Sequence, residues 1–443
     1  MSEFFIISVI LLMFIVFLLS GLYIHSVLFA CGIIGLILLE GFSILPGLLG
    51  NEPFNRAASY TLTTIPLFVL MAQFVLQSGI VQDMFYFINR LSKGNNSLLG
   101  ALTIIIGGLL GAVSGSGTAT AASLGQVAVP ELTKHGYKPE LAAAVAASGG
   151  SLSGIVPPSI ILILYGVATE TPVGDLFMAA VIPSILVMIV FIIVMLACFY
   201  VFRKKTSEAA GLEPERKGPP QQAELPAMRL VVVNAVGLII VIVIFGGIYS
   251  GVFTPTEAGA VGAFTALLST LVLGKVNIAF FTRALTETIK VTGMVMLILI
   301  GAQIFGRFVS LSLLPRKLIN LLDPIMEYPV IVLIVITIAL FIMFMFIEGA
   351  AVILMSIPVI MPIIQAIGVD VLWFGIFISV ICTVGLITPP VGLSVYAVSG
   401  ASKMTPEPIF RYTMLFAFVA TVVVGGIMIA FPDLVLWIPD SME

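Results

Sequence analysis

Two proline pairs, each preceded by glycine and hydroxyl-bearing residues, are the part of this sequence best suited to bind ions. They are Pro157-Pro158 and Pro389-Pro390. Proline donates no backbone hydrogen bond and disfavours helix at the residue before it, so carbonyl oxygens just ahead of each pair should be free. Free carbonyls and hydroxyls suit a hard cation such as Na⁺, and helix N-termini across the same break suit an anionic group.

The same spacing relates other residues that control backbone shape. Matching residue n with residue n+232 superposes the two proline pairs. It also matches Gly117 with Gly349, Pro130 with Pro362, and Gly136 with Gly368. Side-chain identity between the copies is otherwise low, so the repeat rests on glycine and proline. Broken hydrophobic segments at corresponding places in two halves are the best sequence indication of a transporter's binding site.

A second break precedes each proline pair. The first is Ser-Gly-Ser-Gly-Thr at 114–118, and the other is Glu-Gly-Ala-Ala at 348–351. We predict that 114–118 joins 149–158 in one site, and that 348–349 joins 383–390 in a second. Close helix packing is the alternative explanation for so many small residues.

Glu348 is the most informative single side chain. A carboxylate deep in a membrane segment costs at least about 2.5 kcal/mol and usually has a functional partner. A structural hydrogen bond to the amides of the helix tip is one interpretation of Glu348, and direct proton carriage is another.

The elements that position these residues are membrane helices. The chain is 60% hydrophobic and 9% charged, whereas a soluble chain has about 25% charged residues. The sequence predicts an all-α membrane protein with about ten transmembrane helices, which we place at 4–20, 26–49, 61–80, 138–169, 176–202, 228–250, 255–274, 280–306, 370–401 and 410–431. The first apolar stretch lacks the basic start of a signal peptide.

Two longer apolar stretches, 98–133 and 329–365, are broken in the middle by the polar segments. We predict re-entrant helical hairpins, with two full spans in each stretch as the alternative. Most lysines and arginines then fall on one side, which the positive-inside rule makes cytoplasmic, and both termini lie outside. An odd number of crossings separates the hairpins, so the two halves form inverted repeats, as in secondary transporters.

The predicted domains are two halves, 1–202 and 229–443, joined by a polar cytoplasmic linker at 203–228. The first half holds a cytoplasm-facing hairpin and the broken helix 138–169, and the second holds a periplasm-facing hairpin and the broken helix 370–401. Segments 81–97 and 307–327 mix apolar and charged residues and are either interfacial helices or ordinary loops.

Several classes of function are excluded by what the sequence lacks. It has no phosphate-binding loop, which argues against ATP-driven transport. It has no paired catalytic residues at membrane depth, which argues against an enzyme, and no feature of a nucleic-acid-binding protein. Its three cysteines lie in apolar segments and are interpreted as packing residues. A non-transporting scaffold subunit would not need inverted breaks with polar tips.

Several motifs together resemble the large membrane subunit of the tripartite ATP-independent periplasmic (TRAP) transporters, of the DctM or SiaM type. The resemblance covers essentially the whole chain, and its motifs are SGSGTATA at 114–121, Val129-Pro130-Glu131, Lys134-His135-Gly136-Tyr137, the stretch 148–158, Thr254-Pro255-Thr256-Glu257-Ala258-Gly259 and Ile387-Thr388-Pro389-Pro390-Val391-Gly392.

This resemblance implies an elevator-type importer in the bacterial inner membrane. Such subunits work with a small four-helix membrane subunit and a soluble periplasmic substrate-binding protein, and they couple import of an organic acid, such as a C4-dicarboxylate or sialic acid, to a Na⁺ gradient. No extra helices precede 4–20, so the small subunit is expected to be a separate polypeptide. The alternative is a stand-alone Na⁺- or H⁺-coupled anion or dicarboxylate transporter.

The resemblance also implies particular site residues. One Na⁺ is expected near Ser114, Ser116, Gly154, Val156 and Pro157. A second is expected near Gly349, Gly385, Thr388 and Pro389. The substrate would lie between the hairpin tips, against Ser116, Thr118, Ser153, Glu348 and Gly349.

Overall fold

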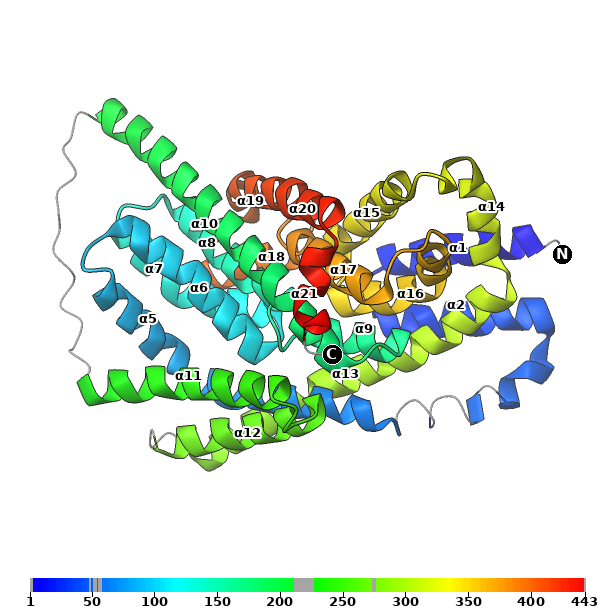
Figure 1. Cartoon of the computed structure of the whole chain (residues 1–443), viewed down its shortest axis with the longest axis horizontal. Helices are drawn as coiled ribbons and strands as arrows, with labels where there is room; N and C mark the ends of the chain where they lie inside the picture. The colour runs from blue at the N-terminus through cyan, green and yellow to red at the C-terminus, as the bar shows by residue number, and fades with distance from the viewer. Residues whose placement is uncertain are drawn as a thin grey trace.

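The computed structural model confirms the predicted all-helical class (Figure 1). It describes residues 3–47, 49–50, 54, 58–210, 227–272 and 276–441, and it contains no strand within those ranges. Six of the described helices are long and apolar enough to cross a membrane, namely Tyr60–Gln77, Val173–Val201, Ile278–Leu311, Pro329–Phe346, Gly349–Ala366 and Pro406–Ala430. Shorter apolar helices accompany them, several of them halves of broken helices.

The offset of 232 residues recurs in the bounds of the helices. Helix α7 spans Gly117–Lys134 and helix α16 spans Gly349–Ala366, so both ends shift by the same amount. The helices on either side follow the same pattern: α6 at Asn96–Ser114 with α15 at Pro329–Phe346, α8 at Pro139–Ser151 with α17 at Val371–Gly385, and α9 at Ile160–Thr169 with α18 at Leu393–Ser402. Each broken apolar stretch is therefore a pair of helices joined by a short tip.

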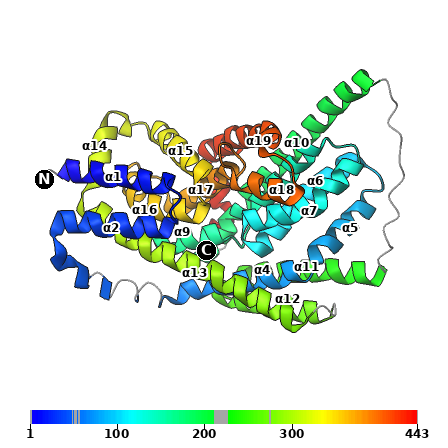
Figure 2. The ribbon, with the colours of Figure 1, turned by 180° about the vertical axis from the view of Figure 1, so that it is seen from behind.

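These eight helices form what we call the central unit, in which helices of one half pack on helices of the other. Helix α18 of the second half packs on α7 and α8 of the first, and α9 of the first half packs on α16 of the second. The α6–α7 and α15–α16 pairs lie on opposite sides of the middle of the molecule in both views (Figures 1 and 2). The packing brings both helix breaks to the middle.

A second group of helices, which we call the outer layer, runs along the lower long edge in Figure 2, with α1 packed on the inner side of α2. Its members are α1 (Glu3–Leu19), α2 (Ile24–Glu40), α4 (Thr64–Gln77), α11 (Ala227–Tyr249), α12 (Pro255–Val272) and α13 (Ile278–Leu311). The main contacts within it are α2 with α13 and α4 with α12 and α13. It meets the central unit where α13 contacts α16 and where α4 contacts α6.

Three further helical segments flank the central unit. Helix α10 (Val173–Ala210) contacts α6 and α17, and α19 (Pro406–Ala420) contacts α8. A π turn at Thr421–Gly425 joins α19 to α20 (Gly426–Ala430), and α21 (Asp433–Asp440) follows. Helix α10 also contacts the 3-10 turn at Leu152–Gly154, and α21 contacts α10 and α17.

The two mixed segments, 81–97 and 307–327, are largely helical rather than ordinary loops. Helix α5 spans Ile80–Leu91 and helix α14 spans Leu314–Met326, each with polar and apolar residues on different faces. This supports the interfacial-helix interpretation. Residues 307–311 belong to α13 instead.

The predicted linker, 203–228, is helical at both described ends. Helix α10 continues to Ala210, and α11 begins at Ala227. The intervening residues, 211–226, lie outside the described residues. The predicted linker is therefore helical at 203–210 and at 227–228, and its role in joining the halves stays a prediction.

Candidate ion and substrate site

The first break lies between α8 and α9. After α8 ends at Ser151, a 3-10 turn covers Leu152–Gly154, and the chain stays non-helical until Ile160. Ser159 Oγ donates a hydrogen bond to the Gly154 carbonyl at 3.0 Å. Within the described chain, no protein group donates to the carbonyl oxygens of Val156 or Pro157. The break thus leaves free backbone oxygens, as the proline pair predicts.

The tip of the α6–α7 pair packs directly on this break. Gly115 ends α6 in the left-handed region at φ +60°, where glycine is favoured, and Ser116 caps α7 by accepting from the Ala119 amide at 3.4 Å. A Cβ atom on Gly111 would lie 2.8 Å from Ser153 Cα. Only glycine permits so close an approach, and it places Ser114 and Ser116 beside the turn that contains Gly154.

The second break repeats this arrangement with other side chains. Helix α17 ends at Gly385, and Thr388 Oγ1 donates to the Val384 carbonyl at 2.7 Å. A Cβ on Gly385 would meet Phe344 Cβ, and one on Gly349 would lie 2.5 Å from Cys382 Sγ. The tip of the α15–α16 pair therefore packs on the second break, as the α6–α7 tip does on the first.

The two breaks and both tips meet in the centre of the molecule. A Cβ on Gly154 would lie 2.8 Å from Thr383 Oγ1, so the first break touches the second. Adjacent residues of α9 contact the two tips. A Cβ on Gly115 would lie 2.9 Å from the Ile160 side chain, and a Cβ on Gly349 would lie 3.0 Å from the Ile161 side chain. Residues predicted for both sites are thus neighbours in space.

The structure divides the predicted substrate residues between the two tips. Ser116, Thr118 and Ser153 lie together at the first tip, where a Cβ on Gly117 would be 3.1 Å from Ser153 Oγ. Ser116 and Thr118 are partly exposed, whereas Ser153 is buried. Glu348 and Gly349 belong to the second tip.

The Glu348 carboxylate lies at the N-terminus of α16. It is close to the backbone amides of Ala350 and Ala351, but it makes no side-chain capping hydrogen bond to the start of α16. Its Oε2 atom is buried and has no hydrogen-bond partner among the described residues. One oxygen of this carboxylate is therefore available to a group that the protein does not supply.

Sequence reasoning missed Ser394, the second residue of α18. Its Oγ would lie 3.5 Å from a Cβ on Gly117, next to Ser153. At the repeat offset, residue 394 corresponds to Leu162, which is apolar. The repeat therefore did not indicate Ser394 as a site residue.

Comparison with known proteins identifies the family. Residues 11–434 match the family model described as "Tripartite ATP-independent periplasmic transporter, DctM component". The chain belongs to the DctM family. Among similar proteins, a C4-dicarboxylate TRAP transporter large permease protein of Pseudomonas aeruginosa is 32% identical over 79% of this chain and 80% of its own length. The sialic acid TRAP transporter large permease protein of Vibrio cholerae is 30% identical over 86% of this chain and 87% of its own length. The 2,3-diketo-L-gulonate TRAP transporter large permease protein of Escherichia coli is 30% identical over 90% of this chain and 93% of its own length.

The predicted resemblance to TRAP large membrane subunits is therefore confirmed, and this DctM-family chain is a multi-pass membrane subunit of a transporter. Its fold is similar to that of the YdaH transporter of Alcanivorax borkumensis, whose crystal structure is described as having an unusual topology. That match has a TM-score of 0.65 at 15% identity and covers 89% of this chain and 90% of the other.

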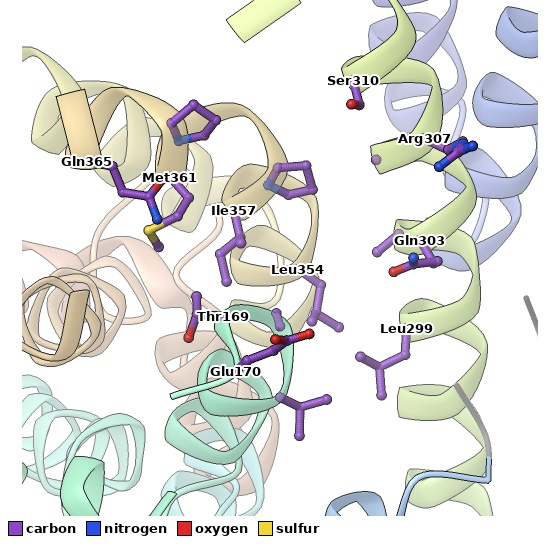
Figure 3. A pocket seen from close by; sticks show the side chains of 16 residues that line it. Thr169, Glu170, Leu299, Gln303, Arg307, Ser310, Leu354, Ile357, Met361 and Gln365 are labelled. Carbon is purple, nitrogen blue, oxygen red and sulfur yellow. The ribbon is translucent and has the colours of Figure 1, made fainter. Parts of the chain in front are cut away.

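The DctM-family chain also has a cavity of about 450 Å³ between its outer layer and its central unit (Figure 3). The end of α9, the C-terminal half of α13 and helix α16 line it. The Glu170 carboxylate extends from the end of α9 toward Gln303 of α13. None of the predicted ion or substrate residues lines this cavity, so it marks the boundary between the two helix groups.

Proposed function

We propose that this chain is the Na⁺-coupled import subunit for an organic acid. A periplasmic binding protein would deliver the acid, and a small four-helix membrane subunit would complete the permease. The chain would lie in the bacterial inner membrane with both termini in the periplasm. The observation that carries this proposal is the repeated packing of a helix tip on a proline-broken helix, once in each half, with both breaks in contact.

Neutral oxygen atoms at the breaks support Na⁺ as the coupling ion. Val156 and Pro157 offer carbonyls that no described protein group uses, and Ser114 and Ser116 lie at the adjoining tip. The second site would use carbonyls near Gly385 and Pro389 together with the Thr388 hydroxyl. Carbonyl and hydroxyl oxygens at an unwound helix suit a hard cation. No group of His, Cys, Asp and Glu able to hold a metal ion occurs among the described residues, which favours a backbone site.

The relatives support an organic anion as the substrate. Their names specify C4-dicarboxylates, sialic acid and 2,3-diketo-L-gulonate, and each of these carries at least one carboxylate at neutral pH. Helices α7 and α16 begin at the two tips, where their positive ends favour an anion. Bound Na⁺ at the neighbouring breaks would add further positive charge.

An elevator movement accounts for the two helix groups. The central unit holds both breaks and both tips, while the outer layer contributes no residue to the predicted sites. Substrate and Na⁺ together would lower the free-energy cost of moving the loaded central unit along the outer layer, because they bind with different affinity in its two positions.

Uptake into proteoliposomes tests the proposal. The chain is reconstituted with its small subunit, and labelled organic acids are added outside with and without the candidate binding protein. We expect uptake only when the binding protein and an inward Na⁺ gradient are both present. Uptake without the binding protein would indicate a stand-alone transporter. Uptake that follows a proton gradient in the absence of Na⁺ would make Glu348 the leading candidate for a proton carrier.

Replacing Thr388 by valine is expected to raise the half-saturating Na⁺ concentration roughly tenfold, because one interaction with a charged group contributes about 1.5 kcal/mol. Valine keeps the shape of threonine and removes only the candidate ligand oxygen. The measurement is initial uptake rate against Na⁺ concentration.

Thr337→Val is the matched control. Its hydroxyl donates to the Leu333 carbonyl at 2.6 Å, the same bond that Thr388 makes to Val384, but it lies in the body of α15. An unchanged Na⁺ dependence in Thr388→Val, or an equal change in both variants, would remove Thr388 from the ion site.

A further inference from the structure

Two buried hydroxyl groups from different halves of the chain point at one helix N-terminus. Ser153, at the first break, and Ser394, near the start of α18, are 1% and 0% exposed. Neither Oγ atom has a hydrogen-bond partner in the part of the chain that the structure describes. Both lie within 3.5 Å of a Cβ atom placed on Gly117, the first residue of the 18-residue helix α7.

Unpartnered hydroxyls are costly at this depth, because a buried polar group loses its hydrogen bonds to water. Other serines of α18 avoid that cost. Ser402 Oγ donates to the Val398 carbonyl at 2.7 Å, and Ser399 Oγ donates to the Met404 carbonyl at 2.6 Å. Ser394 is only the second residue of the helix, so no carbonyl of a preceding helical turn is available to it. Its hydroxyl is left for a partner outside its own helix.

The surrounding groups select an anion rather than a cation. The first amides of α7, those of Gly117 and Thr118, have no partner within the helix, while Ser116 Oγ already accepts from Ala119. Amide and hydroxyl hydrogens together can surround a carboxylate, and the positive end of the helix dipole favours it. Ser116 and Thr118, which are partly exposed, lie at the same helix start.

We propose that Ser394 and Ser153 donate hydrogen bonds to a carboxylate of the transported acid at the N-terminus of α7. This inference rests on the proposed function and assigns one acid group of the substrate to a specific place. Because Ser394 belongs to the second half and α7 to the first, the bound carboxylate joins the halves. Ser394 thereby becomes a substrate-binding residue that links α18 to the first tip.

The test is Ser394→Ala in the full chain with its small subunit. The KM for the transported acid is expected to rise about tenfold, as for the loss of one hydrogen bond to a charged group, while the half-saturating Na⁺ concentration stays unchanged. The melting temperature should not fall, because alanine removes a buried hydroxyl that has no partner. A higher KM with an unchanged melting temperature would show that Ser394 binds substrate rather than stabilising the packing.

Ser402→Ala is the control on the same helix and should leave the KM unchanged. Substrate binding by purified protein provides a second readout. The probes are succinate, N-acetylneuraminate and N-acetylneuraminate methyl ester, with the thermal shift measured in Na⁺ buffer. For a substrate that binds wild type, Ser394→Ala should weaken binding of the free acid and leave the ester little affected.

Each other outcome is decisive. An unchanged KM in Ser394→Ala, or a shift in Na⁺ dependence instead, overturns the carboxylate assignment, and so does a clear fall in melting temperature. If wild type binds an acid but shows no Na⁺-dependent uptake, the transport proposal fails. Comparing acid binding by wild type and by Ser394→Ala still tests whether Ser394 binds the carboxylate. If wild type binds none of the acids and shows no Na⁺-dependent uptake of any acid in the transport assay, both proposals fail.

Discussion

Replacing Gly154 by alanine is expected to lower the rate of Na⁺-dependent uptake roughly 5- to 150-fold, since overpacking a tight interior costs about 1–3 kcal/mol. The new Cβ would lie 2.8 Å from Thr383 Oγ1. Thr383 cannot easily withdraw, because it is fully buried and its hydroxyl is bonded to the Ser379 carbonyl at 2.9 Å. The methyl group would push the two breaks apart at the point where the ion sites adjoin.

A double-mutant cycle isolates this contact. Thr383→Ala removes the obstructing hydroxyl, so Gly154→Ala combined with Thr383→Ala should transport faster than Gly154→Ala alone. Gly293→Ala is the matched control, because a Cβ there meets nothing within 4 Å, and its uptake should equal wild type. Wild-type rates in Gly154→Ala would show that the breaks tolerate separation and that their contact is incidental.

The helical framework was predictable because glycine and proline act on the backbone directly. The matched glycines Gly117 and Gly349 begin helices in both halves, and the matched Gly136 and Gly368 both adopt positive φ. Both proline pairs lie in non-helical breaks. Such residues dictate local conformation whatever surrounds them, so a repeat limited to them still predicts where helices begin and end.

The contacts between the halves were not predictable, because they depend on tertiary packing. Nothing in the sequence indicates that Gly154 faces Thr383, or that Ser394 reaches the start of α7. The helical conformation of 203–210 has a local cause. Residues 203–208 are polar, which indicated a linker, but lysine, glutamate and alanine are also good helix formers, and they extend α10.

A disulfide between α13 and α16 is expected to stop transport. A Cβ on Gly306 would lie 3.4 Å from Pro358 Cβ, close to the separation in natural disulfides. Oxidising Gly306→Cys/Pro358→Cys would join the outer layer to the central unit beside the cavity of Figure 3. Uptake should fall more than about tenfold, because sliding of packed helices requires this interface to change. Dithiothreitol should restore it.

The control disulfide joins two helices of the central unit. Gly125→Cys/Ala401→Cys links α7 to α18, where a Cβ on Gly125 would lie 3.1 Å from Ala401 Cβ, and its oxidation should leave uptake intact. The native cysteines are all buried, which limits competing bridges. If the α13–α16 bridge forms and uptake continues, the central unit does not slide along α13. If only the α7–α18 bridge stops uptake, the movement occurs within the central unit, between the tips and the breaks.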